Sequence, residues 1–214
     1  MDCLSHIITN TATHACADKM QRIWDWQQPH NFHEVQRFLR LMQYLAHFMP
    51  DVTAYTSPLT TCVRNGRQFV WMPLYDKCLE SIKALACQAP VLKPIDTNNP
   101  DPIWVIGNSS KSGVSAIYRQ GPEWQTCHPA GFLSKKFSSA AQNYCTHEHE
   151  TITILEALIK WEDKLLGQKF VIVTGHKGLE YSETQPSLSS RQTRWWEYLS
   201  RFNFTIQHVD GDTN

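Results

Sequence analysis

Asn108 follows a continuous apolar run, Ile103–Gly107, and is itself followed by a small polar turn. An apolar run this short is typical of a strand that is buried on both faces. In α/β folds, the residue just beyond such a strand is a usual place for catalytic groups. A carboxylate at that place could bind a metal ion, whereas an amide offers only a neutral oxygen. The sequence therefore raises the question of whether a carboxylate is missing at position 108.

Two other arrangements of reactive side chains are weaker candidates. His147 and His149 flank Glu148 on a predicted helix, but residues two apart on a helix point about 200° apart, so the two imidazoles cannot share one zinc ion. No cysteine stands at ligand spacing from them. Ser109 and His176 do not belong to a hydrolase motif. No metal site and no cofactor are expected from these residues.

The second half of the chain predicts a mixed α/β domain that positions Asn108 and Glu148. The pattern of apolar residues and turn signals indicates strands at 103–108, 114–119, 126–133, 170–174 and 204–209, and helices at about 140–166, 177–183 and 188–201. The long helix carries an inward stripe and is closed by Gly167; the stripe comprises Tyr144, Glu148, Ile152, Leu155 and Ile159. Because a helical crossover joins the first and fourth strands, these two strands are expected to be parallel and adjacent.

The first half of the chain is predicted to be rich in helices. We expect a short strand at 3–8, helices at 17–26, 32–48, 57–65 and 74–88, and an extended piece at 68–71. Residues 93–102 hold three prolines and two asparagines, which indicates a linker. The sequence thus predicts two domains, at 1–92 and 103–214, joined by residues 93–102.

Composition sets limits on the class of protein. The 214 residues are 42% hydrophobic, enough to fill a core, and 20 basic residues balance 20 acidic ones. A net charge of zero lowers the expectation of a dedicated nucleic-acid binder. The seven cysteines are widely spaced without a C-x-x-C pair, which favours reduced thiols in an intracellular protein of the cytoplasm or nucleus. No apolar run approaches the roughly 18 residues that span a membrane, so no membrane association is expected.

Short motifs along the whole chain resemble the Pol polyprotein of gypsy-type (Metaviridae) LTR retrotransposons, from the end of the reverse transcriptase through its ribonuclease H domain. In the first half these are Leu4–Ile8, Phe38–Leu41 with Tyr44, Pro58–Leu59, and Phe69 with Trp71. In the second half they are Ala89–Leu92, His128–Pro129, Ser134–Lys136, Asn143–Tyr144, Glu148–Glu150, Thr174 with His176–Lys177 and Leu179, and Leu188–Trp195. The resemblance implies an α-rich reverse transcriptase thumb and connection domain, followed by a ribonuclease H-like mixed five-stranded sheet with helices.

The resemblance also implies which residues would form the nuclease site. The family hydrolyses RNA in an RNA–DNA hybrid with two Mg²⁺ ions held by four carboxylates. The first of these falls on Asn108, the second on Glu148, the third on Gly175, and the fourth a few residues beyond Asn214. Only Glu148 is an acid, and among possible substitutes Asp210 and Asp212 lie nearest to the end of the last strand, ahead of Asp101 and Glu180. The polymerase carboxylates of the family lie upstream, so no polymerase activity is expected. Because only one of the four nuclease carboxylates is retained, no nuclease activity is expected either.

Without metal partners, Glu148 is expected to bond to Asn108 or to a backbone group, and burial is expected to raise its pKa. Binding of an RNA–DNA hybrid or another nucleic acid remains open, through cations interleaved with an aromatic residue: Lys135, Lys136, Arg191, Arg194 and Trp195. The alternative is that Trp195 belongs to the core and that the arginines form a solvated helix face.

Three functional hypotheses follow. The first is a catalytically inactive, domesticated remnant that acts as a protein- or nucleic-acid-interaction module. The second is a Mg²⁺-dependent RNA–DNA hybrid ribonuclease H with an altered metal site. The third is a structural subunit that forms a homo-oligomer, and it predicts a large apolar patch on the helix at 32–48.

Overall fold

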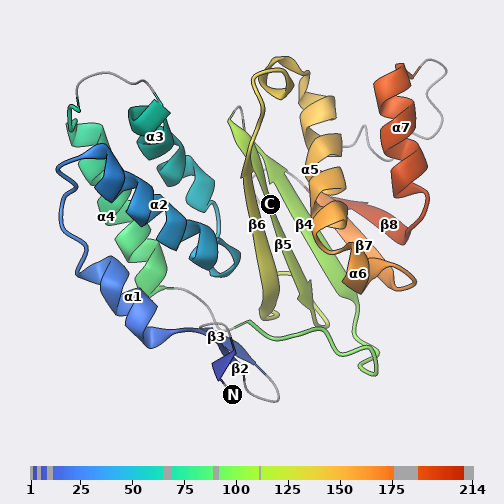
Figure 1. Ribbon diagram of the computed structural model, residues 1–214. Coiled ribbons are helices and arrows are strands. Elements are labelled where there is room, and N and C mark those ends of the chain that lie inside the picture. Colours follow the sequence, from blue (N-terminus) through green and yellow to red (C-terminus); the bar gives the residue numbers. More distant parts are fainter. Residues whose placement is uncertain are drawn as a thin grey trace. The chain divides into compact units, whose positions relative to one another are not determined.

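The computed structural model describes residues 2–3, 6–8, 12–64, 69–88, 92–110, 112–175 and 188–209 (Figure 1). The chain divides into two compact units, Met1–Pro94 and Ile95–Asn214. The division falls inside the proline-rich stretch 93–102. Part of this stretch is tied to the second unit, because the Gln120 amide donates to the carbonyls of Asp96, Asn99 and Asp101 at 3.0–3.2 Å.

The first unit combines a small antiparallel sheet with helices. Its sheet is β1 (Asp2–Cys3), β2 (His6–Ile8) and β3 (Thr13–Ala15), followed by α1 (Ala17–Trp24), α2 (Phe32–Leu45), the 3-10 turn η1 (Ala46–Phe48), α3 (Val52–Arg64) and α4 (Pro73–Cys87). Asn31 caps the N-terminus of α2, since its side chain accepts from the Glu34 amide at 2.9 Å. The core holds fully buried side chains of all four helices and of η1, among them Ile23, Phe38, Phe48, Leu59 and Ile82.

Two expectations for this unit are wrong. The single strand at 3–8 is two strands, which pair as Cys3 with His6. The helix expected at 57–65 begins at Val52, with Pro58 inside it rather than at its start. Residues 69–71, the described part of the extended piece expected at 68–71, lie in neither a helix nor a strand. In addition, α2 presents no large exposed apolar side chain among those described, so the patch that the structural-subunit hypothesis predicts is not found there.

The second unit is built on a five-stranded mixed sheet in the order β6-β5-β4-β7-β8. The strands are β4 (Ile103–Ser109), β5 (Gly113–Gln120), β6 (Pro129–Lys136), β7 (Lys169–Thr174) and β8 (Asn203–His208). The first and fourth of them, β4 and β7, are adjacent and parallel, as the crossover predicted. Strand β6 begins at Pro129 rather than at Thr126. The expected helix at 177–183 lies outside the described residues.

One face of this sheet is covered by helices. These are α5 (Thr146–Lys160), the short α6 (Glu162–Leu165) and α7 (Ser190–Leu199), and α5 lies across the sheet with α7 beside it (Figure 1). The expected single helix at 140–166 is therefore wrong. A 3-10 turn η2 (Ala141–Asn143) precedes α5, and Trp161 leaves helical geometry between α5 and α6, with its ring buried against Tyr118 at 4.9 Å.

The shorter helix changes the predicted stripe: Tyr144 precedes α5, and Ile159 is exposed. Among the described residues, none of the helices is long and apolar enough to cross a membrane.

Candidate nuclease-type site

The ends of β4 and β7 bring Asn108 and Gly175 to the same edge of the sheet. The parallel register pairs Ile106 with Val173, and the two positions follow two residues later on each strand. The Asn108 carbonyl accepts from Ser115 Oγ at 3.4 Å, and the Gly175 carbonyl accepts from His208 Nε2 at 3.1 Å. The two sequence-predicted positions thus lie together, and neither supplies a carboxylate.

The carboxylate that reaches these strand ends is that of Glu150. Its Oε1 accepts from Ser109 Oγ at 2.6 Å, and its Oε2 accepts from Thr174 Oγ1 at 3.5 Å. Ser109 follows Asn108, and Thr174 precedes Gly175. Glu150 was not among the predicted site residues, although it stands two positions from Glu148.

A close approach between α5 and β4 places Glu150. A Cβ at Gly107 would lie 2.9 Å from Thr153 Cγ2, so the helix can contact the strand here only because residue 107 has no side chain. Glu150 precedes Thr153 by three residues and lies on the same side of the helix. The signal in the sequence is a glycine inside an apolar strand together with the small residues Thr153 and Ala157 on the helix. It indicates that this side of the helix lies against the strand, and Glu150 is the acid on that side.

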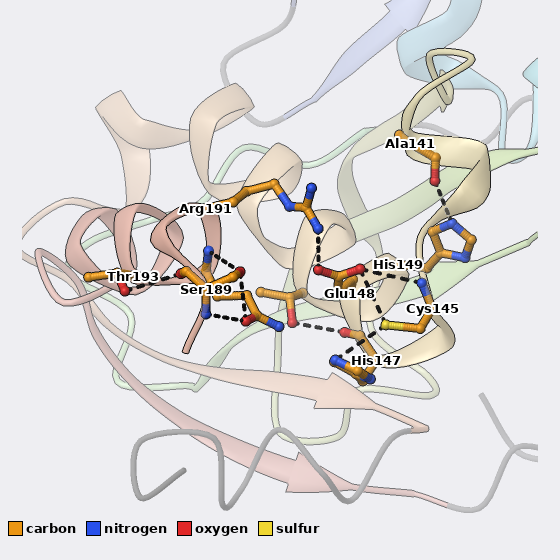
Figure 2. Close-up of polar contacts among 10 residues, drawn as sticks. Ala141, Cys145, His147, Glu148, His149, Ser189, Arg191 and Thr193 are labelled. Atoms are coloured by element: carbon orange, nitrogen blue, oxygen red, sulfur yellow. Dashed lines mark hydrogen bonds and ion pairs between the residues drawn. The ribbon is translucent and has the colours of Figure 1, made fainter. Parts of the chain in front are cut away.

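Glu148 points elsewhere. Its Oε1 accepts from Arg191 Nη2 at 2.5 Å, and its Oε2 accepts from the Cys145 amide at 3.4 Å and the Cys145 thiol at 3.2 Å (Figure 2). Arg191 also stacks over the ring of Tyr144 at 3.9 Å and lies 5.4 Å from that of Trp195. Glu148 therefore caps the N-terminus of α5, and its ion pair with Arg191 links α5 to α7.

The expected rise in the pKa of Glu148 is wrong. Burial by itself raises this pKa, but the hydrogen bond and the charge of Arg191, together with the bonds from Cys145, outweigh it and hold the pKa below its usual value. The expected bond to a backbone group is present at Cys145. The counter-charge was not among the expectations, because Arg191 lies 43 residues further along the chain, in a different helix.

The two histidines beside Glu148 point apart, as the helix period predicted. His147 Nε2 lies 3.4 Å from Cys145 Sγ, while His149 Nε2 donates to the Ala141 carbonyl at 2.7 Å (Figure 2). Within the described part of the chain, no three side chains of His, Cys, Asp or Glu are grouped as metal ligands.

The described residues at the strand ends do not fit a pair of Mg²⁺ ions. Two dications about 4 Å apart need several anionic oxygens to offset their mutual repulsion. The strand ends supply the Glu150 carboxylate, the Asn108 amide and a glycine. The other acids considered as substitutes, Glu180, Asp210 and Asp212, lie outside the described residues, and Asp101 stands at the opposite end of β4.

The five candidate nucleic-acid-binding residues do not form one surface. Lys135 pairs with Glu156 at 2.6 Å, and Arg191 is occupied by Glu148. Trp195 packs against the core of the second unit. Lys136, at the end of the edge strand β6, and Arg194, on α7, are exposed, and Figure 1 shows α5 between these two elements.

Comparison with known proteins agrees with this architecture. Residues 98–202 match the family described as the RNase H-like domain found in reverse transcriptase. The Tf2-3 and Tf2-4 transposon polyproteins of Schizosaccharomyces pombe are each 29% identical to this chain over 204 residues, which cover 93% of this chain and 15% of each polyprotein. The chain thus spans only a small part of these relatives.

Solved structures show the same fold. A foamy viral protease–reverse transcriptase in complex with double-stranded DNA matches with a TM-score of 0.80 and 23% identity, over 98% of this chain and 37% of the other. The same kind of viral protein in complex with an RNA/DNA hybrid matches with a TM-score of 0.78 and 22% identity, over 99% and 29%. The resemblance inferred from the motifs is confirmed for this part of the chain: residues 98–202 match the RNase H-like domain found in reverse transcriptase, and the chain is similar to retrotransposon polyproteins over 93% of its length.

Proposed function

We propose that the second unit is a non-hydrolytic RNase H-like module, which acts by binding rather than by cleaving an RNA–DNA hybrid. The observation that carries this proposal is the composition of the strand ends, where, among the described residues, an amide and a glycine accompany a single acid, Glu150. The Ser109 hydroxyl, 2.6 Å from that acid, already occupies one of its oxygens.

We assign the acid of the ancestral site to Glu150 rather than to Glu148. Glu150 contacts residues next to Asn108 and Gly175, whereas Glu148 is neutralised by Arg191 on the other side of the helix. Two residues apart on a helix, the two carboxylates point about 200° apart, so they cannot serve the same metal ion.

A cleavage assay tests the loss of hydrolysis. The full chain is incubated with a labelled RNA–DNA hybrid in Mg²⁺ or in Mn²⁺, beside its Glu150→Gln and Glu148→Gln variants. We expect no hydrolysis above the level of the Glu150→Gln preparation. Cleavage by the parent chain that disappears in Glu150→Gln would overturn the proposal and support the alternative of an altered metal site.

For the binding partner, we propose nucleic acid, held weakly through its phosphates. The foamy viral relatives were solved with double-stranded DNA and with an RNA/DNA hybrid. In this chain, the exposed Lys136 and Arg194 are available for phosphate contacts, while Lys135 and Arg191 are neutralised by glutamates. With two of these four candidate cations paired, we expect low affinity, and no binding at all would favour a protein partner.

A further inference from the structure

Strand β8 forms an edge of the second unit's sheet. It pairs with β7 in parallel register, and the Val209 amide continues this ladder by donating to the Thr174 carbonyl at 3.0 Å. Backbone groups of alternate residues point to the same side of a strand. The amides and carbonyls of Asn203, Thr205 and Gln207 therefore face β7, and those of Phe204, Ile206 and His208 face outward. No residue of the described ranges pairs with this outer edge.

The opposite edge of the sheet is protected, whereas β8 is not. Strand β6 begins with Pro129 and ends with Lys135 and Lys136, the residue types that discourage pairing with another chain. Strand β8, with the sequence Asn-Phe-Thr-Ile-Gln-His, contains no proline, lysine, arginine or acid. An uncharged edge of this kind is a template for a further strand.

We propose that the outer edge of β8 pairs with β8 of a second copy of this chain, antiparallel about a two-fold axis at Ile206, to give a continuous ten-stranded sheet. In this register Ile206 of one copy lies opposite Ile206 of the other, and Phe204 of each copy lies opposite His208 of the other. All three outward amides and all three outward carbonyls of each strand are then paired. A two-fold axis makes the contact self-complementary, as a closed dimer requires.

The side chains of β8 suit this pairing with itself. Its burial alternates, with Asn203, Thr205 and Gln207 exposed and Phe204, Ile206 and His208 partly buried. The register places polar Thr205 opposite polar Gln207 on one face, and aromatic or β-branched residues opposite one another on the other face. No like charges meet, and the chain has as many basic as acidic residues, 20 of each, so no net charge repels a second copy.

Sedimentation velocity of the full chain over a range of concentrations, with the variants Thr205→Lys and Thr205→Val, tests the pairing. The Thr205 side chain is exposed, so both substitutions leave the core intact. We expect a reversible dimer that Thr205→Lys weakens at least tenfold, because it places a charge on the edge, and that Thr205→Val preserves. A parent chain that stays monomeric up to millimolar concentration would overturn the proposal.

Amide hydrogen exchange identifies the surface. In the monomer, the amides of Thr205 and Gln207 are bonded to β7, whereas those of Phe204, Ile206 and His208 have no strand partner within the described ranges. Dimerisation should slow exchange at these three amides alone within the strand. A dimer that leaves them unprotected, or one that Thr205→Lys leaves unchanged, uses a different surface and also overturns the proposal. A cleavage result does not bear on this pairing, since the edge is separate from the nuclease-type site.

Discussion

The Ser109 hydroxyl donates to the Glu150 carboxylate at 2.6 Å and so joins the end of β4 to the first turns of α5. In a working two-metal site, the oxygens of such a carboxylate would be directed at cations. Here one oxygen is bound to Ser109, and the other lies 3.5 Å from Thr174 Oγ1. Both oxygens of this carboxylate therefore have a hydroxyl group as hydrogen-bond partner within the protein.

Restoring the two missing acids should restore metal binding. In the double variant Asn108→Asp/Gly175→Asp, three carboxylates would stand at the ends of β4, α5 and β7. We expect calorimetric titration with Mn²⁺ to show an affinity at least about tenfold above that of the parent chain, a difference of about 1.4 kcal/mol.

Glu150→Gln in the same background is the control for this titration. It should abolish the gain, because the amide removes one of the three charges, whereas Glu148→Gln should leave the gain in place. If Glu150→Gln and Glu148→Gln reduced the gain in Mn²⁺ affinity equally, the assignment of Glu150 to the site would be contradicted.

The contact between Gly107 and Thr153 should be sensitive to a single methyl group. Gly107→Ala places a Cβ 2.9 Å from Thr153 Cγ2, and Thr153 is fully buried, with its hydroxyl bonded to the His149 carbonyl. We expect this substitution to lower the free energy of unfolding by about 1–3 kcal/mol, as is usual for overpacking.

Thr153→Ser tests the cause of this loss, since it removes Cγ2 and keeps the hydroxyl. Denaturant unfolding of the double variant Gly107→Ala/Thr153→Ser should recover most of the loss. Strictly additive losses would mean that the methyl contact is not the source of the strain.

Much of the fold was predictable from local patterns. The apolar runs of β4 and β7, the turn at Gly121 and the crossover helix between the two strands determine a mixed sheet with β4 and β7 adjacent. The site was predictable only in part. Asn108 follows directly from the end of a strand, whereas Gly175 came from the resemblance to the retrotransposon family. The choice between Glu148 and Glu150 depends on helix rotation, which the apolar stripe indicated wrongly because Tyr144 and Ile159 are not part of the buried helix face.

Long-range pairing explains what remained unpredicted. Arg191 contacts Glu148 from α7, and no pattern in the residues around Glu148 predicts a partner so distant in the sequence. The split of the expected long helix also has a tertiary cause, since the buried Trp161 ring stacks on Tyr118 from β5 and interrupts the helix.

Removing Arg191 should destabilise the second unit more than a surface substitution does. Arg191→Met leaves the Glu148 carboxylate, whose side chain is 10% exposed, without its counter-charge, and it removes the stack over Tyr144. We expect the Tm to fall by several degrees. In thermal unfolding, the double variant Arg191→Met/Glu148→Gln should recover part of this loss in Tm, because the uncompensated charge is gone. A decrease in Tm equal to the sum of the decreases of the two single variants would contradict a direct pairing.

The acid dependence of stability should carry the signature of Glu148. Because its pKa in the folded protein lies below the usual value of 4.5, Glu148 stabilises the fold above that pH, and this stabilisation is lost as the pH falls through the folded-state pKa. The difference in Tm between the parent chain and Glu148→Gln should therefore be largest near pH 6–7 and should close as the pH falls below about 4. The pKa values of Glu34 and Glu162 are lowered too, but both residues are present in both proteins, so their effects cancel. A difference that widens in acid would show that the pKa of Glu148 is raised.

Nucleic-acid binding, finally, should show a shallow dependence on salt. If Lys136 and Arg194 provide the phosphate contacts, about two counterions are released on binding, and the logarithm of the affinity should fall with the logarithm of salt concentration with a slope of about −2. Fluorescence anisotropy with a labelled RNA–DNA hybrid between 50 and 200 mM salt measures this slope. Lys136→Gln and Arg194→Gln should each reduce it by about one, whereas Lys135→Gln should change it little, since Lys135 is already paired with Glu156 at 2.6 Å. A steep slope that is unaffected by both substitutions would place the binding surface elsewhere on the chain.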